Sequence, residues 1–498
     1  MTNDYDIVII GGSLAGYQAA LTATHLRAKV ALVEPQINYE WQYYRILGEI
    51  AQKLQQSQGL AHLGIYPPDL DRNGVNLVMP SLPGGINWEK LDLYAQGVGS
   101  NLEQQYALSN LTTQGVDVIL GDGEFQAAPR LGFKVGDGET PSVAARTLYS
   151  RTYILATGSR PAIPKIEGLQ TVSYLTLANI DQTLQQANPP QNWVILGGLP
   201  QSIEIAQTLA LLGYRVTLIV KHRYLLPEID PELNQLLIAQ LEVNGVRILT
   251  HTTVTQVREI NGEKWVQAGD KAINTEAILV ATKQRPNLEF LNLAAVGVKW
   301  HQHKLIVNKK LQTTNHRIYA CGDILGGYSL TNIAQYEANL ILQNALFFPK
   351  NSVNYRCVPW GIHTQPMLAQ VGLTETEAKR QYQQNQFLVI KQYFKSLSIA
   401  QIQAETTGIC KLIVRDNGEI LGASIFGKNA GELINIIALA MSENIYIHKL
   451  AKLAPIYPTY TEILLQAADE WHQQKIQRNH NLQEFLESFF HFRRDWNL

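Results

Sequence analysis

The sequence Asp6-Ile-Val-Ile-Ile-Gly-Gly-Ser-Leu-Ala-Gly16 decides the first part of the fold. Its β-branched run, residues 6–10, is typical of a buried parallel strand, and a helix is expected to begin in the glycine-containing turn behind it. A second strand is predicted over residues 29–33, directly before Glu34. Strand, glycine turn, helix, strand and acid in this order are typical of a βαβ unit that holds a dinucleotide.

The chemistry of such a unit explains its spacing. Gly11 and Gly16 allow backbone amides to approach a pyrophosphate, and the helix N-terminus adds partial positive charge. Glu34 is expected to accept hydrogen bonds from ribose hydroxyls. Ser13 stands where the middle glycine is usual, and its small side chain is compatible with a close ligand. The alternative is a glycine turn in an α/β domain that binds no nucleotide.

A second βαβ unit is predicted further along the chain. The apolar run at residues 193–196 leads into Gly197 and Gly198, which are expected to face a second nucleotide. Leu199 stands where a glycine usually admits the pyrophosphate, and Ser202 stands where a glycine lets helix and strand pack closely. The sequence therefore leaves open whether this unit binds a nucleotide.

The second strand of this unit is predicted over residues 215–220. Sites selective for NAD carry an acid after this strand, whereas Val220 is apolar and Lys221-His222-Arg223 follows it. Lys221 and Arg223 suit the 2′-phosphate of NADPH, so NADPH is favoured over NADH if a nucleotide binds. The alternative is that the basic residues form a solvated turn.

Two more segments extend the pattern. Residues 152–161 contain Ala-Thr157-Gly158, and residues 318–323 end in Cys-Gly-Asp323. Together with the two βαβ units, they resemble the pyridine nucleotide-disulphide oxidoreductases, the family of dihydrolipoamide dehydrogenase, mercuric reductase and glutathione reductase. The resemblance implies that FAD occupies the first site, with Thr157 and Gly158 where the chain leaves the FAD domain and Asp323 on the ribityl chain.

The C-terminal third resembles the dimerisation domain of the same family in residues 358–374 and 408–435, which implies a homodimer. The implied fold is α/β, with two Rossmann-like dinucleotide-binding domains and a C-terminal α+β dimerisation domain. The expected domains are a split FAD-binding domain (1–160 and 281–348), an NAD(P)-binding-like domain (161–280), a dimerisation domain (349–470) and an amphipathic helical tail (471–498).

The sequence departs from this family at its catalytic positions. Residues 38–47, where the family carries a redox-active CxxxxC pair, contain no cysteine, so dithiol exchange is not expected there. Tyr457 replaces the family's catalytic histidine, and a phenol with an ordinary pKa of about 10 is a poor base at neutral pH. Tyr457, Glu462 and Glu204 are the candidates for catalysis. The alternatives are an interface tyrosine and two structural glutamates.

The composition excludes several function classes. Lys and Arg (41) nearly balance Asp and Glu (42), so no overall field favours nucleic acid. The three cysteines are too far apart for a redox pair or a zinc site, and no metal is expected. Sparse cysteine, an acidic N-terminus and the lack of a long apolar run favour a cytoplasmic protein without a leader or a spanning helix.

The last residues, 481–498, place large apolar side chains near helical spacing. An amphipathic helix with an aromatic face is expected there. This face either makes a peripheral membrane contact or packs against the body or the dimer partner.

The sequence as a whole favours an FAD-dependent oxidoreductase that works without a redox disulphide. NAD(P)H would reduce the flavin, and a quinone or another small acceptor would take the electrons. The alternative is a catalytically retired flavoprotein whose FAD has a structural or interaction role.

Overall fold

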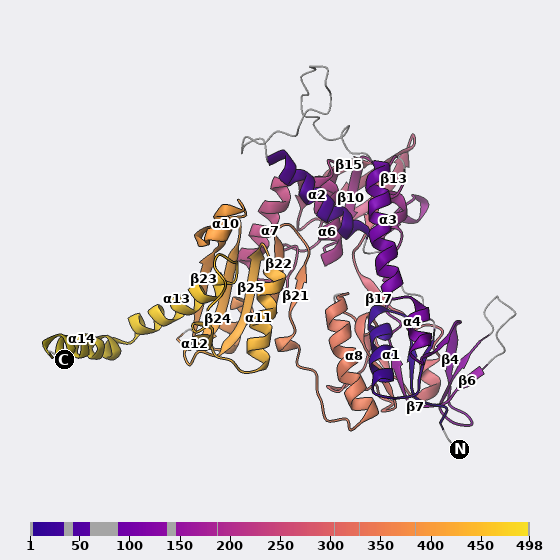
Figure 1. Cartoon of the computed structure of the whole chain (residues 1–498). Coiled ribbons are helices and arrows are strands. Elements are labelled where there is room, and N and C mark those ends of the chain that lie inside the picture. Colours follow the sequence, from indigo (N-terminus) through magenta and orange to yellow (C-terminus); the bar gives the residue numbers. More distant parts are fainter. Residues whose placement is uncertain are drawn as a thin grey trace, which may run out of the picture. The chain divides into compact units, whose positions relative to one another are not determined.

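The computed structural model describes residues 3–33, 43–59, 88–136, 146–186, 188–302, 304–327, 329–383 and 385–496. It divides into two compact units (Figure 1). The first unit comprises Met1–Leu225 and Leu241–Val353, and the second comprises Leu226–Gln240 and Asn354–Leu498. A short piece from the middle of the sequence therefore belongs with the C-terminal third.

The first unit contains a five-stranded parallel sheet. Its order is β20 (Ile318–Ala320), β7 (Ser150–Leu155), β1 (Tyr5–Ile10), β2 (Val30–Val33) and β3 (Asp117–Ile119). The last four residues of β1 are all buried, because both faces of a parallel sheet are covered. The predicted strands at residues 6–10 and 29–33 are confirmed.

Helices and a small sheet cover this parallel sheet. α1 (Leu14–His25) and α8 (Thr331–Leu346) contribute to one hydrophobic cluster with the strands (Figure 1). The other cluster includes the antiparallel strands β4 (Gly123–Gln126), β5 (Gly132–Val135) and β6 (Arg146–Leu148). Further helices of this unit are α2 (Tyr43–Gly59), α3 (Trp88–Gln105), α4 (Leu108–Thr113) and α5 (Ile180–Leu184).

A second parallel sheet lies in the same unit. Its order is β12 (Val246–Leu249), β11 (Arg215–Ile219), β10 (Asn192–Leu196), β16 (Ala277–Val280) and β9 (Leu175–Thr176). α6 (Pro200–Leu211) follows β10, as α1 follows β1. An antiparallel sheet of β13 (Val254–Ile260), β14 (Glu263–Ala268) and β15 (Lys271–Thr275) packs beside it.

The chain passes between these two Rossmann-like parts through a two-stranded antiparallel pair, β8 (Ser159–Pro161) and β17 (Gln284–Pro286). The insertion of one βαβ part into the other follows directly, because β8 leaves the first sheet and β17 returns towards it.

The second unit contains a five-stranded antiparallel sheet. Its order is β21 (Trp360–Ile362), β22 (Met367–Gly372), β25 (Ile420–Gly427), β24 (Ile409–Arg415) and β23 (Phe387–Tyr393). α11 (Ala430–Ser442) and α13 (Glu462–Arg478) share its main hydrophobic cluster. Two parallel α/β parts and an antiparallel α+β part confirm the predicted fold class.

The shorter helices of the second unit are α9 (Glu375–Gln381), α10 (Ser398–Ile402) and α12 (Ile447–Leu450). α13 runs past residue 470 to Arg478, and α14 (His480–Asp495) ends the described chain. None of the helices among the described residues has the length and apolar character needed to cross a membrane.

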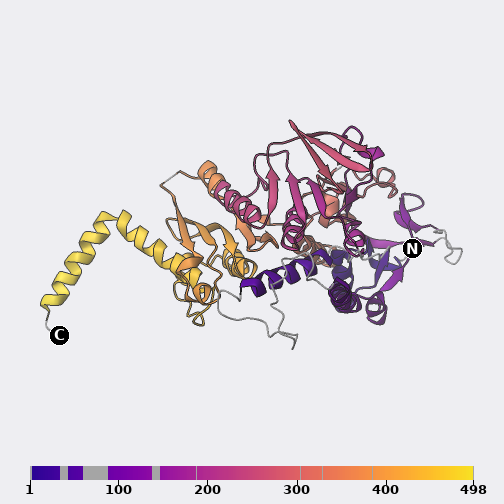
Figure 2. The same cartoon turned by 90° about the horizontal axis from the view of Figure 1, so that it is seen from above.

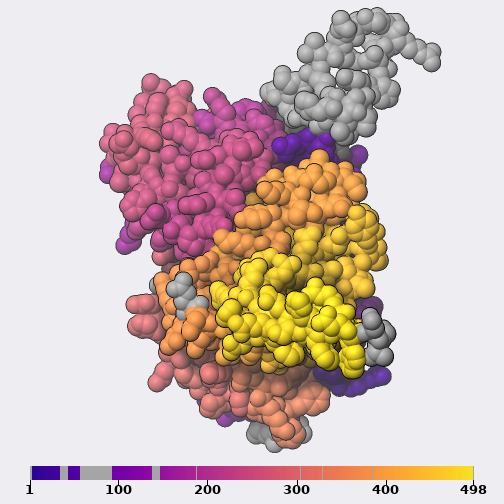
Figure 3. Space-filling model, turned by 90° about the vertical axis from the view of Figure 1, so that its left-hand side faces the viewer, coloured from indigo at the N-terminus to yellow at the C-terminus, as the bar shows by residue number. Residues whose placement is uncertain are grey.

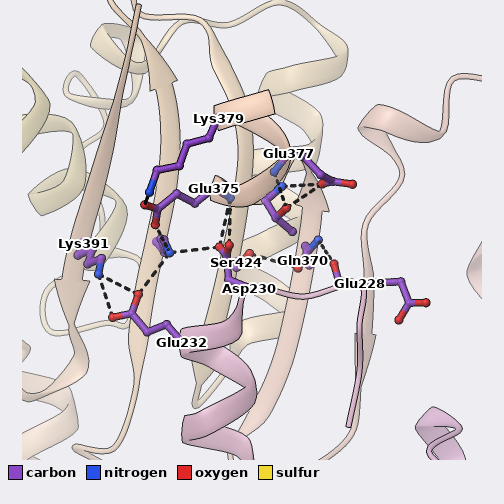
Figure 4. A network of polar contacts seen from close by, with 11 residues as sticks. Glu228, Asp230, Glu232, Gln370, Glu375, Glu377, Lys379, Lys391 and Ser424 are labelled. Atoms are coloured by element: carbon purple, nitrogen blue, oxygen red, sulfur yellow. Dashed lines mark hydrogen bonds and ion pairs between the residues drawn. The ribbon is translucent and has the colours of Figure 1, made fainter. Parts of the chain in front are cut away.

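A buried ion cluster fastens the start of α7 (Pro231–Val243) to the sheet of the second unit (Figure 4). The Lys411 Nζ lies 2.6 Å from a Glu375 oxygen, 3.2 Å from Asp230 and 3.3 Å from Glu232. Burial alone would lower the pKa of Lys411, but hydrogen bonding to Glu375 and the charge of Asp230 raise it. Lys391 also binds Glu232, at 2.8 Å. Such a cluster is stable only when its charges are complete, because a lone buried charge is costly.

Candidate functional site

Two positions of the turn after β1, residues 11 and 16, have room only for glycine. Gly11 has a φ of +112°, and a Cβ added to it would lie 2.3 Å from the Ala156 carbonyl oxygen. A Cβ on Gly16 would lie 2.2 Å from the Gly11 carbonyl oxygen. These distances leave no room for a side chain, because the turn packs closely on β7 and α1 packs closely on the turn. The backbone of residues 11–16 is thus held at the carboxyl end of the sheet.

The N-terminus of α1 is prepared for negative charge. Ser13 is the N-cap, and its Oγ accepts a hydrogen bond of 3.2 Å from the Gly16 N–H. No acidic residue occurs in the first turn of α1, all of which is described, so the partial positive charge of the helix end is not neutralised locally. Glu34, predicted to bind ribose, lies outside the described residues.

Thr157 and Gly158 lie directly after β7, beside the same turn. The Thr157 Oγ1 donates to the Asn287 carbonyl oxygen at 3.0 Å, and the Asn287 Nδ2 donates back to the Thr157 carbonyl oxygen at 2.9 Å. Gly158 has a φ of +67°, and among the described residues no heavy atom lies within 4 Å of its added Cβ. At this crossing, two hydrogen bonds therefore fix Thr157 to Asn287, and the space beside Gly158 is open among the described residues.

Asp323 follows β20 in a short 3-10 helix, Gly322–Leu325. The Ser159 Oγ donates to its carboxylate at 3.2 Å, and the Ser329 hydroxyl donates to the same oxygen. Burial raises the pKa of Asp323 above its ordinary value, although the Ser329 and Ser159 hydrogen bonds partly oppose this. The carboxylate is thus positioned by two hydroxyls at the carboxyl ends of the central strands.

The start of α2 carries a polar group in the place expected for the missing cysteines. The Glu204 carboxylate of α6, 3% exposed, accepts a hydrogen bond of 3.0 Å from the Tyr44 hydroxyl and forms an ion pair of 3.2 Å with the Arg45 Nε. Burial raises the pKa of Tyr44, and the negative charge of Glu204 raises it further. Burial would lower the pKa of Arg45, but Glu204 raises it. Residues 38–42 of this stretch lie outside the described residues.

One face of α6 connects these groups. The Gln201 Nε2 donates to the Ser329 carbonyl oxygen at 2.8 Å, and Ser329 in turn binds Asp323. Gln201 and Glu204 are three residues apart and therefore share a helix face. The three-residue spacing is the local sequence signal for Gln201. No local pattern predicts Ser329, or Tyr44 and Arg45 as the partners of Glu204.

The turn after β10 repeats the first turn only in part. Gly197 has a φ of +120°, and its added Cβ would lie 2.1 Å from the Ala281 carbonyl oxygen. The Ser202 Oγ, however, donates to the carbonyl oxygens of Leu199 and Gly197 at 2.7 and 3.1 Å. Leu199 is the N-cap of α6 without a side-chain hydrogen bond, and Pro200 begins the helix without an N–H. Fewer polar groups can therefore reach a phosphate here.

Gly198 and the basic residues lie around the same end of this sheet. A Cβ on Gly198 would lie 2.9 Å from the Leu225 carbonyl oxygen and 3.2 Å from a methyl carbon of the buried Val220. Lys221 and Arg223 follow β11 and are exposed. The Arg223 guanidinium lies 5.6 Å from the centre of the Tyr224 ring. Both cations are therefore accessible at the strand end next to the Gly197 turn.

Tyr457 and Glu462 belong to the second unit. The Tyr457 side chain is 70% exposed, and its hydroxyl donates to the Ser398 Oγ at 3.0 Å. The Glu462 Oε1 accepts a hydrogen bond of 2.8 Å from the Thr459 N–H at the start of α13. Within this unit, Glu462 therefore satisfies a backbone donor, and Tyr457 stands at the surface.

The cysteines do not form a reactive pair. Cys321 and Cys410 are buried, and burial raises the pKa of both thiols, that of Cys410 to about 12. All three cysteines are free thiols. Within the described ranges, no group of His, Cys, Asp and Glu side chains could hold a metal ion.

Comparison with protein families identifies the family to which this chain belongs. Residues 5–338 match the pyridine nucleotide-disulphide oxidoreductase model, and residues 358–468 match the dimerisation domain of the same family. The chain belongs to the pyridine nucleotide-disulphide oxidoreductase family. This is a family of FAD-binding oxidoreductases that use NAD(P)H, and its dimerisation domain supports a homodimer.

Curated relatives support the family assignment over almost the whole chain. Mercuric reductase of Staphylococcus aureus is 30% identical over 478 residues, which cover 93% of this chain and 82% of that protein. A dihydrolipoyl dehydrogenase of Synechocystis is 29% identical over 488 residues, which cover 93% of this chain and 98% of that protein.

The fold is also similar to solved structures. LpdA of Mycobacterium tuberculosis gives a TM-score of 0.81 at 21% identity, covering 93% of this chain and 99% of that one. A Cu(II) complex of the HOCl-induced flavoprotein disulfide reductase RclA from Escherichia coli gives a TM-score of 0.77 at 22% identity. The match covers 94% of this chain and 99% of that one. At these identities the two structures support the fold alone.

Proposed function

We propose that this chain is an FAD-dependent NAD(P)H:acceptor oxidoreductase that works without a redox disulphide and passes electrons to a quinone or another small acceptor. One observation carries the proposal. The first βαβ turn keeps both closely packed glycines, while the start of α2 carries Tyr44 and Arg45, bound to Glu204, in the expected place of the family's cysteine pair.

The residues around β1 fit FAD. In the proposal, residues 1–160 and 281–348 form its domain, the backbone of the Gly11–Gly16 turn would hold the pyrophosphate, and Asp323 would accept hydrogen bonds from the ribityl chain. The space beside Gly158, open among the described residues, and the α1 end without an acid in its first turn support this, because a ligand needs room and an anion needs positive potential. When bound, FAD supplies two-electron redox chemistry.

The chain's own groups have separate roles in this proposal. Arg45 and Tyr44 hold the Glu204 carboxylate in one place, so that α2 and α6 keep a fixed polar contact beside the proposed flavin. The sequence contains no cysteine from residue 34 to residue 59, so a thiolate step is not part of the mechanism. A planar acceptor such as a quinone needs no thiol.

The inserted part, residues 161–280, is proposed to receive NADPH in preference to NADH. The exposed Lys221 and Arg223 at the end of β11 support this preference, because a 2′-phosphate is recognised by charge-assisted hydrogen bonds. Gly197 and Gly198 would lie nearest the nucleotide backbone. We assign no proton-transfer role to Tyr457 or Glu462, since Glu462 already binds the Thr459 amide.

A second candidate function is a catalytically retired FAD-binding protein with a structural or interaction role. The observation that favours it is the turn after β10. The Ser202 hydroxyl binds the carbonyl oxygens of that turn, and Pro200 removes an amide donor from the start of α6. Both changes weaken phosphate recognition.

Anaerobic mixing with NADPH and NADH distinguishes the two functions. The proposed oxidoreductase predicts that NADPH bleaches the flavin absorbance faster than NADH, and that a soluble quinone then restores it. A flavin band that neither nucleotide bleaches would exclude this activity. Titration calorimetry with NADPH separates slow chemistry from lack of binding, because a retired site should give no binding heat.

A further inference from the structure

The C-terminal helix α14 (His480–Asp495) carries apolar side chains that its own unit does not cover. Asn479 ends α13 and caps α14, with its side chain accepting from the Leu482 N–H at 3.1 Å, so the chain bends between the two helices (Figure 2). None of the described residues of α14 is buried. Figure 3 shows this yellow tail at the molecular surface.

Large apolar side chains lie near helical spacing along α14 and at its C-cap: Leu482, Phe485, Leu486, Phe489, Phe490, Phe492 and Trp496. Five of them form one regular row. Leu482, Phe485, Phe489, Phe492 and Trp496 follow one another at intervals of three, four, three and four residues. This is the a/d heptad spacing by which two helices pair along a seam, and Leu486 and Phe490 flank the row. The spacing therefore fits a helical partner.

The side chains along this seam are exposed and already arranged as a row. Phe485 is 61% exposed, Phe492 59% and Trp496 59%. The ring centres of Phe485 and Phe489 are 6.1 Å apart, and those of Phe492 and Trp496 are 5.1 Å apart. A row of exposed aromatic rings marks an interaction surface, because contiguous apolar surface is unfavourable in water.

The charges of α14 argue against a lipid surface as the partner. Helices that bind membrane interfaces are rich in Lys and Arg on their polar face. In α14, Arg493 and Arg494 are offset by Glu484, Glu487 and Asp495. An anionic membrane would therefore gain little electrostatic attraction.

A second copy of this chain is the partner that fits these observations. The family dimerisation domain matches residues 358–468, and α13, which begins at Glu462 inside that match, leads directly into α14. α14 thus follows directly on the domain whose family match supports self-association. A two-fold pair requires a self-complementary surface, and a row of apolar rings without a strong charge pattern meets that requirement.

We propose that α14 pairs with α14 of a second copy through the seam formed by Leu482, Phe485, Phe489, Phe492 and Trp496, and that this pairing strengthens self-association. The inference does not depend on the proposed redox function. It adds a second contact, outside the matched dimerisation domain, to the assembly.

Sedimentation velocity over a dilution series tests the pairing in the full-length protein. Phe489→Ser and the double variant Phe485→Ser/Phe489→Ser are compared with Phe490→Ser, which removes the same side chain from the flank of the row, where its ring centre lies 5.5 Å from that of Phe489. Phe490 is 51% exposed and Phe489 42%, so neither substitution should lower the unfolding temperature. The seam variants are expected to dissociate at concentrations at least about tenfold higher than the native chain, since burial of a Phe side chain is worth roughly 1.5–3 kcal/mol.

Two outcomes would overturn the proposal. The first is an identical dissociation profile for the native chain, both seam variants and Phe490→Ser. The second is flotation of the native chain, but not of Phe489→Ser, with vesicles of phosphatidylcholine and phosphatidylglycerol, because the seam would then bind lipid. Matching profiles for Phe490→Ser and the native chain, with weaker association of the seam variants alone, would support it.

Discussion

The two βαβ units have a first glycine in the same backbone conformation, but they differ two positions later, at Ser13 and Leu199. Gly11 and Gly197 have φ values of +112° and +120°, and an added Cβ would approach the carbonyl oxygens of Ala156 and Ala281 to 2.3 and 2.1 Å. The turn on the neighbouring strand requires this glycine whether or not a ligand binds. It is therefore a residue of the fold.

The later positions differ between the two βαβ units. In the first βαβ unit, Ser13 caps α1 and Gly16 packs against the turn. In the second βαβ unit, Leu199 offers no side-chain cap and the Ser202 hydroxyl binds the turn carbonyl oxygens. Both units form the same strand–helix pair. The strand–helix pair therefore forms without the cap and the third glycine of the first turn.

The largest effect is expected from Gly11→Ala. The added methyl group would meet the Ala156 carbonyl oxygen, and the positive φ would add strain, so the free energy of unfolding should fall by about 3 kcal/mol or more. FAD content, measured from the visible absorbance of the purified variant, should drop to near zero. Gly97→Ala is the control, because no described heavy atom lies within 4 Å of its added Cβ. Retention of FAD by Gly11→Ala would contradict the need for glycine at this position.

The next effect is expected from Glu204→Gln, which tests the contact between α6 and α2. Glu204→Gln removes the buried negative charge that pairs with Arg45, so the free energy of unfolding should fall by about 2–3 kcal/mol in chemical denaturation. Glu289→Gln removes a carboxylate from partly exposed ion pairs with Arg160 and Arg285 and should lower the free energy of unfolding by less than about 1 kcal/mol. Equal losses for both variants would show that the Glu204 contact is an ordinary surface pair.

A smaller effect is expected from Leu199→Gly, which makes the second turn more like the first. Removal of the side chain should let a pyrophosphate approach, and NADPH should bind about tenfold more tightly, or about 1.4 kcal/mol, in titration calorimetry. Adding Arg223→Ala to this variant should reduce the affinity for NADPH more than that for NADH. Unchanged NADPH affinity in Leu199→Gly would mean that Leu199 is not what limits binding.

The smallest effect is expected from Asp323→Asn. Because burial raises the pKa of Asp323 in the folded protein, its contribution to stability is fully present below the unfolded pKa and is lost as pH rises through the folded pKa. The FAD-free variant should therefore unfold at a slightly higher temperature than the native FAD-free protein at pH 7. The difference should vanish at acidic pH, where the aspartate is protonated. A lower unfolding temperature at pH 7 would contradict the burial argument.

The sequence predicted the parts of the fold that repeat over short distances. The run Asp6–Ile10, the glycine turn behind it and the strand before Glu34 are local patterns, and β1, α1 and β2 lie where these patterns place them. The same holds for β10 and β11. Local periodicity is the strongest signal that a single sequence carries.

The contacts that join distant segments could not be predicted in the same way. Gln201 meets Ser329 across 128 residues, and Glu204 meets Arg45 across 159. No local pattern encodes such pairs. Lys411 is a partial exception, because a lysine inside the apolar strand Ile409–Arg415 indicates a buried charge that needs partners, although not which ones.

The visible absorption spectrum of the purified full-length protein, recorded before and after incubation with FAD, tests the first nucleotide site most directly. A site formed by the Gly11–Gly16 turn and Asp323 predicts flavin bands at about one FAD per chain that survive gel filtration. Protein that is colourless as isolated and takes up no FAD would contradict it.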